Sequence, residues 1–215
     1  MSIRRTLRYI AILMSGLVVA IPNLGCNIGV ETTQSTGGGP SPTNPANPSN
    51  AASAAKLGPT VTKPAVGNVT PLLQVDNCYL AGQPQVADLE AFKAAGVKKI
   101  ISLRDPSEIN WDERAAVEAA GLEFVQIAMR SPDQMTAEKI TEVCSLLQQA
   151  EENDELVVLH CGAAVRASAV WLAYYCVSKK ATWQDAETVA TSLVKVPASW
   201  TDPVKSYVEQ NVAGN

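Results

Sequence analysis

Apolar residues in the larger, C-terminal part of the chain follow two alternating spacings. A continuous apolar run rich in β-branched residues, typical of a buried strand, lies at 156–159. Strands are also predicted at 77–81, 98–103 and 122–128. Apolar positions at helical spacing follow these strands and predict helices over 86–95, 107–120, 136–151 and from Arg166 onward. Strands separated by helices predict an α/β fold with a mainly parallel central sheet flanked by helices.

The end of the chain is predicted to add two helices. Thr182 and Asp185 match the capping box that opens a helix. Pro203 is a residue type favoured in the first turn of a helix, so it is predicted to start the last one. Together with the alternating part, these helices predict one folded domain over residues 69–215, close to the usual length of a domain.

The predicted sheet places several polar residues on one rim. In parallel α/β sheets, ligands sit beyond the carboxyl ends of the strands. Arg104 and Asp105 follow the second predicted strand, residues 129–133 follow the third, and Cys161 follows the fourth. We therefore expect these segments to meet around a common site.

The first 68 residues have the pattern of a targeting segment and a tether. Residues 1–25 contain three Arg and then a 12-residue apolar stretch, which is too short to span a bilayer and is typical of a signal peptide. It ends in Asn-Leu-Gly-Cys, which resembles a lipoprotein cleavage site with Cys26 as the lipidated residue. Plain secretion and an uncleaved anchor are the alternatives. Residues 26–68, rich in Gly, Pro, Ser and Asn, predict a disordered linker. We expect a protein of a bacterial cell envelope, lipid-anchored or periplasmic.

Composition narrows the set of partners. The formal charge is −4 and becomes −7 once residues 1–25, with three Arg and no acid, are removed. An acidic chain does not suggest nucleic-acid binding. One His and five Cys without paired spacing suggest neither a disulfide framework nor a zinc site. We therefore expect a monomer without metal or cofactor that contacts the membrane only through its N-terminal lipid.

The run ELVVLHCGAAVRAS, from Glu155 to Ser168, carries the chemistry. His160 and Cys161 end the strand, and the loop before Arg166 consists of Gly162, Ala163, Ala164 and Val165. Unpaired backbone N–H groups at the start of the next helix attract an anion, and Arg166 can place two donors on its oxygens. The same field favours the reactive thiolate of Cys161. The alternative is a buried structural Cys beside a surface Arg.

The stretch HCGAAVRAS resembles the active loop of the cysteine-dependent phosphatase superfamily, in which His-Cys is followed by a short loop, Arg, and Ser or Thr. Tyrosine phosphatases have five residues between Cys and Arg, whereas this chain has four, and Ala167 follows the Arg with Ser168 one position later. Four spacers resemble the rhodanese sulfurtransferase loop and also the beta-lactamase-hydrolase-like phosphatase branch. That branch usually has Gly at the position of Ala164.

Other segments extend the resemblance to that phosphatase branch from about residue 76 to 190. They are YLAGQP at 79–84, AAGVKKIISLR at 94–104, GLEFVQIAM at 121–129 and LHC at 159–161. The resemblance implies a protein-tyrosine-phosphatase-like fold and hydrolysis of phosphate monoesters through a phosphorylated Cys161. It also implies that residues 162–166 bind the phosphate.

The resemblance assigns the remaining roles as follows. A general acid is expected on a loop after an earlier strand, and Asp133 is the first candidate. Asp105, with Glu108 behind it, is the second. His160 is expected to orient the loop without acting as a base, and Ser168 and Arg104 are expected to support the site.

Two other functions remain open at this stage. A rhodanese-like sulfurtransferase would carry a persulfide on Cys161, and the short loop suits that smaller guest. A non-catalytic phosphate-binding module would fit Ala164 in place of Gly and Ala167 in place of the usual Ser or Thr. For a phosphatase, the sequence leaves open whether the substrate is a phosphorylated protein, a small phosphate ester or a lipid head group.

Overall fold

The computed structural model describes residues 58–212. The predicted signal segment 1–25, the lipidation site Cys26 and most of the predicted linker lie outside these residues. Within residues 58–212, no helix is both long enough and apolar enough to cross a membrane.

The strands of the described region form one six-stranded sheet in the order β1-β2-β3-β6-β4-β5. Their bounds are β1 Val61–Thr62, β2 Leu72–Val75, β3 Cys78–Ala81, β4 Val97–Ser102, β5 Glu123–Gln126 and β6 Leu156–His160. The strands β3, β6, β4 and β5 pair in parallel, whereas β1 and β2 add an antiparallel edge. The prediction of a mainly parallel sheet is therefore confirmed. β6 pairs along both edges, with β3 and with β4, and its successive residues from Val157 to His160 are buried. Both faces of β6 are therefore covered, which explains why its apolar run is continuous.

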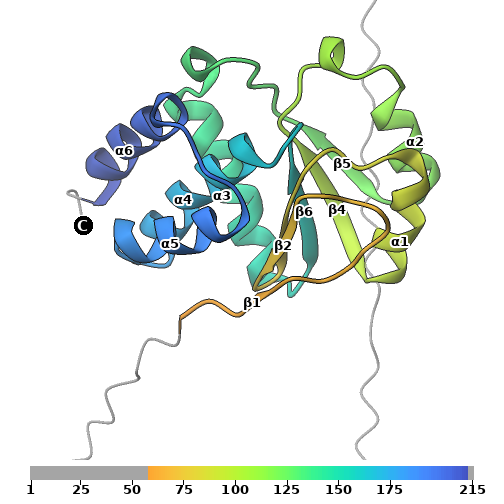
Figure 1. Cartoon of the computed structure of the whole chain (residues 1–215), viewed down its shortest axis with the longest axis horizontal. Coiled ribbons are helices and arrows are strands. Elements are labelled where there is room, and N and C mark those ends of the chain that lie inside the picture. Colours follow the sequence, from red (N-terminus) through yellow and green to blue (C-terminus); the bar gives the residue numbers. More distant parts are fainter. Residues whose placement is uncertain (1–57, 213–215) are drawn as a thin grey trace, which may run out of the picture. The chain divides into compact units, whose positions relative to one another are not determined.

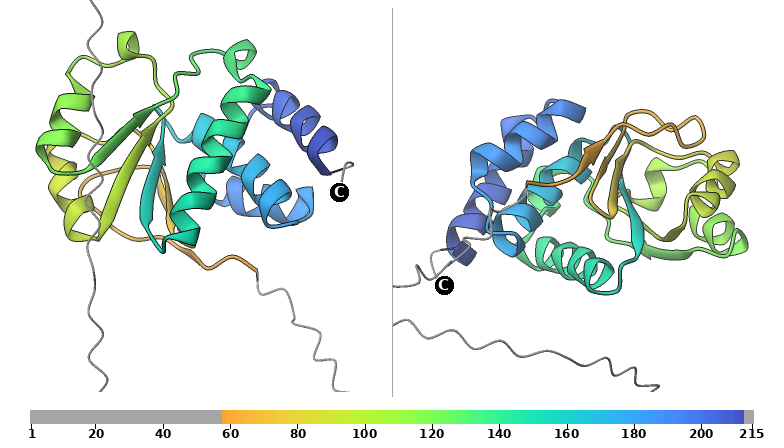
Figure 2. Two further views of the ribbon diagram at one scale, coloured as in Figure 1. Left: turned by 180° about the vertical axis from the view of Figure 1, so that it is seen from behind. Right: turned by 90° about the horizontal axis from the view of Figure 1, so that it is seen from below.

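Helices cover both faces of the sheet (Figure 1, Figure 2). The bounds are η1 Val86–Asp88, α1 Leu89–Ala94, η2 Pro106–Glu108, α2 Glu113–Ala119, η3 Pro132–Gln134, α3 Ala137–Glu152, α4 Val165–Ser178, α5 Trp183–Leu193 and α6 Ala198–Val212. The helices α1 and α2 pack on one face around Phe92 and Val117. The helices α3 to α6 lie on the other face, and α4 is enclosed by α3, α5 and α6. This enclosure buries most of α4 and fixes the loop that precedes it.

Three expectations from the sequence need correction. The helix predicted over 107–120 is broken: Asp105 caps the short η2, and Asp112 restarts the chain as α2 by accepting from Ala115 N–H at 3.0 Å. The last helix begins at Ala198, so Pro203 lies inside it. The predicted linker ends before residue 68, because β1 pairs with β2 and Val66 is buried.

Candidate active site

The loop after β6 is held by the ends of its two neighbouring strands. The N–H of Cys161 donates to the carbonyl of Ala81 at 3.3 Å, and the N–H of Leu103 donates to the carbonyl of His160 at 2.9 Å. The N–H of Gln83 donates to the carbonyl of Gly162 at 3.1 Å. The loop therefore sits at the carboxyl end of the sheet, where the sequence placed it, and the Gly82-Gln83-Pro84 turn supports one of its sides.

Ala164 turns the loop into α4 with a left-handed backbone, at φ 61°. This conformation is unfavourable for a residue with a Cβ and is the reason why glycine is usual at such a position. Ala164 is also the N-cap of α4 and has no side-chain oxygen to accept from the first turn. The first N–H groups of α4 thus lack a capping acceptor from this residue, and together with the helix dipole they favour an anion in the loop.

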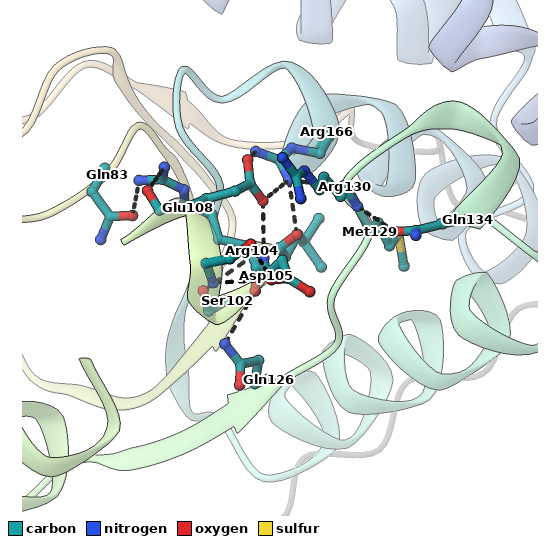
Figure 3. A network of polar contacts seen from close by, with 12 residues as sticks. Gln83, Ser102, Arg104, Asp105, Glu108, Gln126, Met129, Arg130, Gln134 and Arg166 are labelled. Atoms are coloured by element: carbon teal, nitrogen blue, oxygen red, sulfur yellow. Dashed lines mark hydrogen bonds and ion pairs between the residues drawn. The ribbon is translucent and has the colours of Figure 1, made fainter. Parts of the chain in front are cut away.

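Arg166 is almost buried, with 8% of its surface exposed, and it is held at one edge (Figure 3). Its Nη1 donates to the carbonyls of Leu103 at 3.1 Å and Met129 at 2.9 Å, and to Glu108 Oε2 at 2.9 Å. Its Nη2 donates to Glu108 Oε1 at 2.9 Å. Five N–H donors belong to a guanidinium, so Nε–H and the second Nη2 hydrogen remain for another acceptor.

The remaining donors of Arg166 point toward the loop. A Cβ placed on Gly162 would lie 3.9 Å from Arg166 Nη2. Burial lowers the pKa of Arg166, but the hydrogen bonds to Glu108 and the interaction with Cys161 outweigh this and raise it. Arg166, Gly162 and Cys161 therefore face a common space, in the arrangement that a bound tetrahedral oxyanion requires.

The sequence suggested Glu108 only as a residue near the candidate acid Asp105. In the structure Glu108 is the main side-chain partner of Arg166. Burial raises the pKa of Glu108, but its hydrogen bonds to Arg166 and to the N–H of Asp105 lower it overall, so it is a carboxylate at neutral pH. Arg104 donates to the carbonyl of Glu108 and to Gln83 Oε1, the latter at 2.7 Å. Arg104 therefore ties the η2 segment to the Gly82-Gln83-Pro84 turn and supports the site indirectly.

A second buried carboxylate, Glu113, lies beneath the loop and was missed by the sequence analysis. Its Oε1 accepts from Gln83 Nε2 at 2.5 Å and lies 3.3 Å from Nε2 of His160, and its Oε2 accepts from Ser102 Oγ at 2.8 Å. Burial lowers the pKa of His160 in spite of the Glu113 charge, which favours a neutral ring at pH 7. This state is consistent with the structural role expected for His160.

The two candidate acids differ in their surroundings. Asp133 lies in η3, is exposed, and has no hydrogen bond or ion pair with any residue of the described region. Asp105 instead accepts from the N–H of Ser107 at 2.9 Å and from its hydroxyl at 2.6 Å. These hydrogen bonds, and the charge of Arg130, lower the pKa of Asp105. Asp105 is thus the cap of η2.

Ser168, which the resemblance assigned a supporting role, does not reach the loop through a hydrogen bond in the described region. Ser168 is fully buried in α4, and its Oγ has no hydrogen-bond partner within residues 58–212. Burial raises the pKa of Cys78 and of Cys144 to about 12 and that of Cys176 to about 11. In the described region, no group of three or more His, Cys, Asp or Glu could hold a metal ion.

Part of the chain matches a known protein family. Residues 77–181 match the model of a family described as a polymorphic toxin system DSP-PTPase phosphatase. No curated protein matches the chain.

Solved structures show the same fold. A putative phosphatase (DUF442) from Shewanella putrefaciens is 19% identical, with 67% of this chain and 95% of that chain covered and a TM-score of 0.55. PTPMT1 in complex with PI(5)P is 15% identical, with coverages of 64% and 93% and a TM-score of 0.56. A Cys-to-Ser variant of TpbA from P. aeruginosa in complex with pTyr is 19% identical, with coverages of 66% and 86% and a TM-score of 0.54. The predicted tyrosine-phosphatase-like fold is confirmed.

Proposed function

We propose that this chain is a cysteine-dependent phosphatase of the dual-specificity and tyrosine phosphatase superfamily, in which Cys161 is the nucleophile and Arg166 binds the transferred phosphate. The match of residues 77–181 to a phosphatase family and the fold shared with solved phosphatases support this proposal. The observation that supports this assignment most is the set of contacts on Arg166. Glu108 and two carbonyls hold one edge of the guanidinium, which leaves a pair of donors directed at the loop of Cys161. The substrate is a phosphorylated protein or a small phosphate ester.

The reaction proceeds in two displacements. The thiolate of Cys161 attacks phosphorus, an S–P bond forms, and the P–O bond to the leaving group breaks while an acid donates a proton to that oxygen. Water then attacks the phosphocysteine, gives its proton to the same carboxylate, and releases phosphate and the thiolate. Arg166 and the N–H groups at the start of α4 stabilise the charge on the phosphoryl oxygens in both steps.

Asp133 is the proposed acid. The segment before η3 lies at the site, because the carbonyl of Met129 accepts from Arg166 at 2.9 Å. The carboxylate of Asp133 has no competing partner in the described region, whereas that of Asp105 is occupied by Ser107. Among the three functions considered from the sequence, the family match favours the phosphatase over the sulfurtransferase and the binding module.

Substitution of Asp133 tests the proposed mechanism. We expect Asp133→Asn to lower kcat for an alkyl phosphate by about 10²-fold or more, the usual scale of general-acid catalysis. The loss shrinks when the leaving group is an acidic phenol, which departs without a proton. Asp105→Asn is the matched control and keeps most of the activity. Turnover of thiosulfate and cyanide to thiocyanate, with Asp133→Asn equally active, would instead support the sulfurtransferase.

We also propose that a lipid on Cys26 anchors the protein in the cell envelope. Support for a tethered arrangement comes from the place where the chain enters the domain. Val61 pairs with Val75 and Val75 with Cys78 at the start of β3, whereas Ala81 at its end pairs with His160. Cys78 pairs with Val157, and Cys161 follows four residues later, so the entry point is separated from Cys161 by roughly 13 Å along the strand.

A further inference from the structure

Trp200 lies beside the catalytic arginine, although it stands outside the segment that matches the family. The family match ends at residue 181, and Trp200 is in the first turn of α6. Its ring centroid is 6.0 Å from Cζ of Arg166, within cation–π distance. Trp200 is half-buried, so part of the residue remains accessible to solvent.

The start of α6 holds Trp200 firmly. The N–H of Trp200 donates to the carbonyl of Pro197 at 3.0 Å, and Thr201, the next residue, is buried. One turn and two turns further on, Val204 and Tyr207 are buried too, and the hydroxyl of Tyr207 lies 3.1 Å from Thr141 Oγ1 on α3. The ring is therefore placed by a packed helix.

The same helix borders the loop of the proposed acid. α6 contacts both η3, which carries Asp133, and α4, which carries Arg166 (Figure 1, Figure 2). The open donors of Arg166 fix the phosphate next to this corner, and the leaving group must extend from the phosphate toward solvent and toward Asp133. Because Trp200 is in the first turn of α6 and its ring lies over Arg166, we expect a leaving group on this path to pass beside that ring.

We propose that Trp200 is a specificity-determining residue that stacks against the leaving group, so that the site prefers phosphate esters of aromatic alcohols, as in phosphotyrosine. This inference rests on the proposed function, since it uses the same phosphate position. Two aromatic rings in offset or edge-to-face contact gain binding free energy beyond that of burying their surface, and this gain corresponds to about a two- to tenfold increase in affinity. A serine or threonine phosphate has no ring and does not gain it.

Trp200 has a competing explanation that makes different predictions. If the ring served only to position the guanidinium of Arg166, its removal would weaken every phosphate ester equally and would also weaken inorganic phosphate. A ring that contacts the leaving group changes the ratio between aromatic and aliphatic esters, and it leaves the affinity for inorganic phosphate nearly unchanged.

Binding to a form without turnover measures this ratio. The full chain with Cys161→Ser is titrated calorimetrically with one peptide carrying phosphotyrosine or phosphoserine at the same position, and with inorganic phosphate. We expect tighter binding of the phosphotyrosine peptide, and we expect Trp200→Ala to reduce that preference by about two- to tenfold. Trp200→Phe retains most of it. Equal weakening of all three ligands, or an unchanged ratio, would overturn the proposal.

Trp183 provides the matched control. It is also a half-buried tryptophan with a cation–π contact, to Lys205 at 5.2 Å, but it opens α5 next to Thr182 and away from the loop of Cys161. Trp183→Ala reports the general cost of removing an indole from this helical layer, and we expect it to leave the peptide ratio unchanged. Because binding is measured without chemistry, an inactive wild type would refute the proposed catalysis and would leave the aromatic preference to be judged by these titrations.

Discussion

Replacement of Glu108 by Gln tests how Arg166 is held. The carboxylate makes two charge-assisted hydrogen bonds with the guanidinium, each 2.9 Å long, and the side chains are only 10% and 19% exposed. Bonds of this kind contribute about 1.5–3 kcal/mol each. The amide keeps one neutral acceptor and turns an NH₂ group toward Arg166, so we expect a loss of about 2–3 kcal/mol in the free energy of unfolding.

The same change should reduce catalysis, because Arg166 would no longer be fixed with its open edge toward the loop. If the whole loss of about 2–3 kcal/mol falls on the transition state, kcat/KM decreases about 30- to 160-fold. Urea unfolding and steady-state kinetics on one protein preparation measure both effects. Glu118→Gln is the control. Glu118 pairs with Arg114 at 3.3 Å, and the two side chains are 56% and 53% exposed, respectively. Exposed ion pairs of this kind contribute less than about 1 kcal/mol to stability. Equal effects of the two substitutions would refute this account of Arg166.

The pH dependence of this stability term has a defined sign. Burial acts to raise the pKa of Glu108, but the hydrogen bond from Arg166 lowers it below the ordinary value of 4.5. A carboxyl whose pKa is lower in the folded state stabilises the protein above its unfolded pKa, and this stabilisation is lost as the pH falls through the folded pKa. The difference in stability between wild type and Glu108→Gln should therefore narrow below about pH 4.5.

Three other substitutions or measurements are informative. Ala164→Gly should raise the free energy of unfolding by up to about 1 kcal/mol, because glycine adopts the left-handed backbone without strain. The control Ala115→Gly, inside a helix, should lower the free energy of unfolding, and a loss of stability in both variants would contradict the proposed strain at Ala164. Iodoacetamide should modify Cys161 faster than Cys144, whose pKa burial raises to about 12, and phosphate should protect Cys161; equal rates would count against an activated thiol. Cys26→Ser should abolish lipid labelling and release the protein from membranes, and an unchanged membrane fraction would exclude the lipid anchor.

The sequence predicted the elements whose signals are local. β6 with its continuous apolar run, the helix start at Arg166, and the chain segments at the carboxyl ends of the strands all lie as expected. The contacts of Arg166 with the carbonyls of Leu103 and Met129 confirm that these segments meet on one rim. Each of these inferences needed only periodicity and the rule for ligand positions in parallel sheets.

The partners of the site could not be predicted in the same way. Glu108 reaches Arg166 across 58 residues, and Glu113 lies under His160 although nothing in the sequence distinguishes it from other helix-start acids. Trp200 was missed because Pro203 suggested a later helix start than the structure shows. These side-chain contacts form between segments that are distant in the sequence, so they depend on how the segments pack and cannot be predicted from local sequence patterns.

The most direct measurement of the central claim is the capture of a phosphate on Cys161. The protein is mixed with an aryl phosphate, quenched in acid within the first turnover, digested and analysed by mass spectrometry. We predict one added phosphoryl group on the peptide that contains Cys161, with none in Cys161→Ser and less in Arg166→Lys, whose ammonium cannot place two donors on the phosphate. Release of phosphate by Cys161→Ser at the rate of the wild type would contradict the nucleophile assigned here.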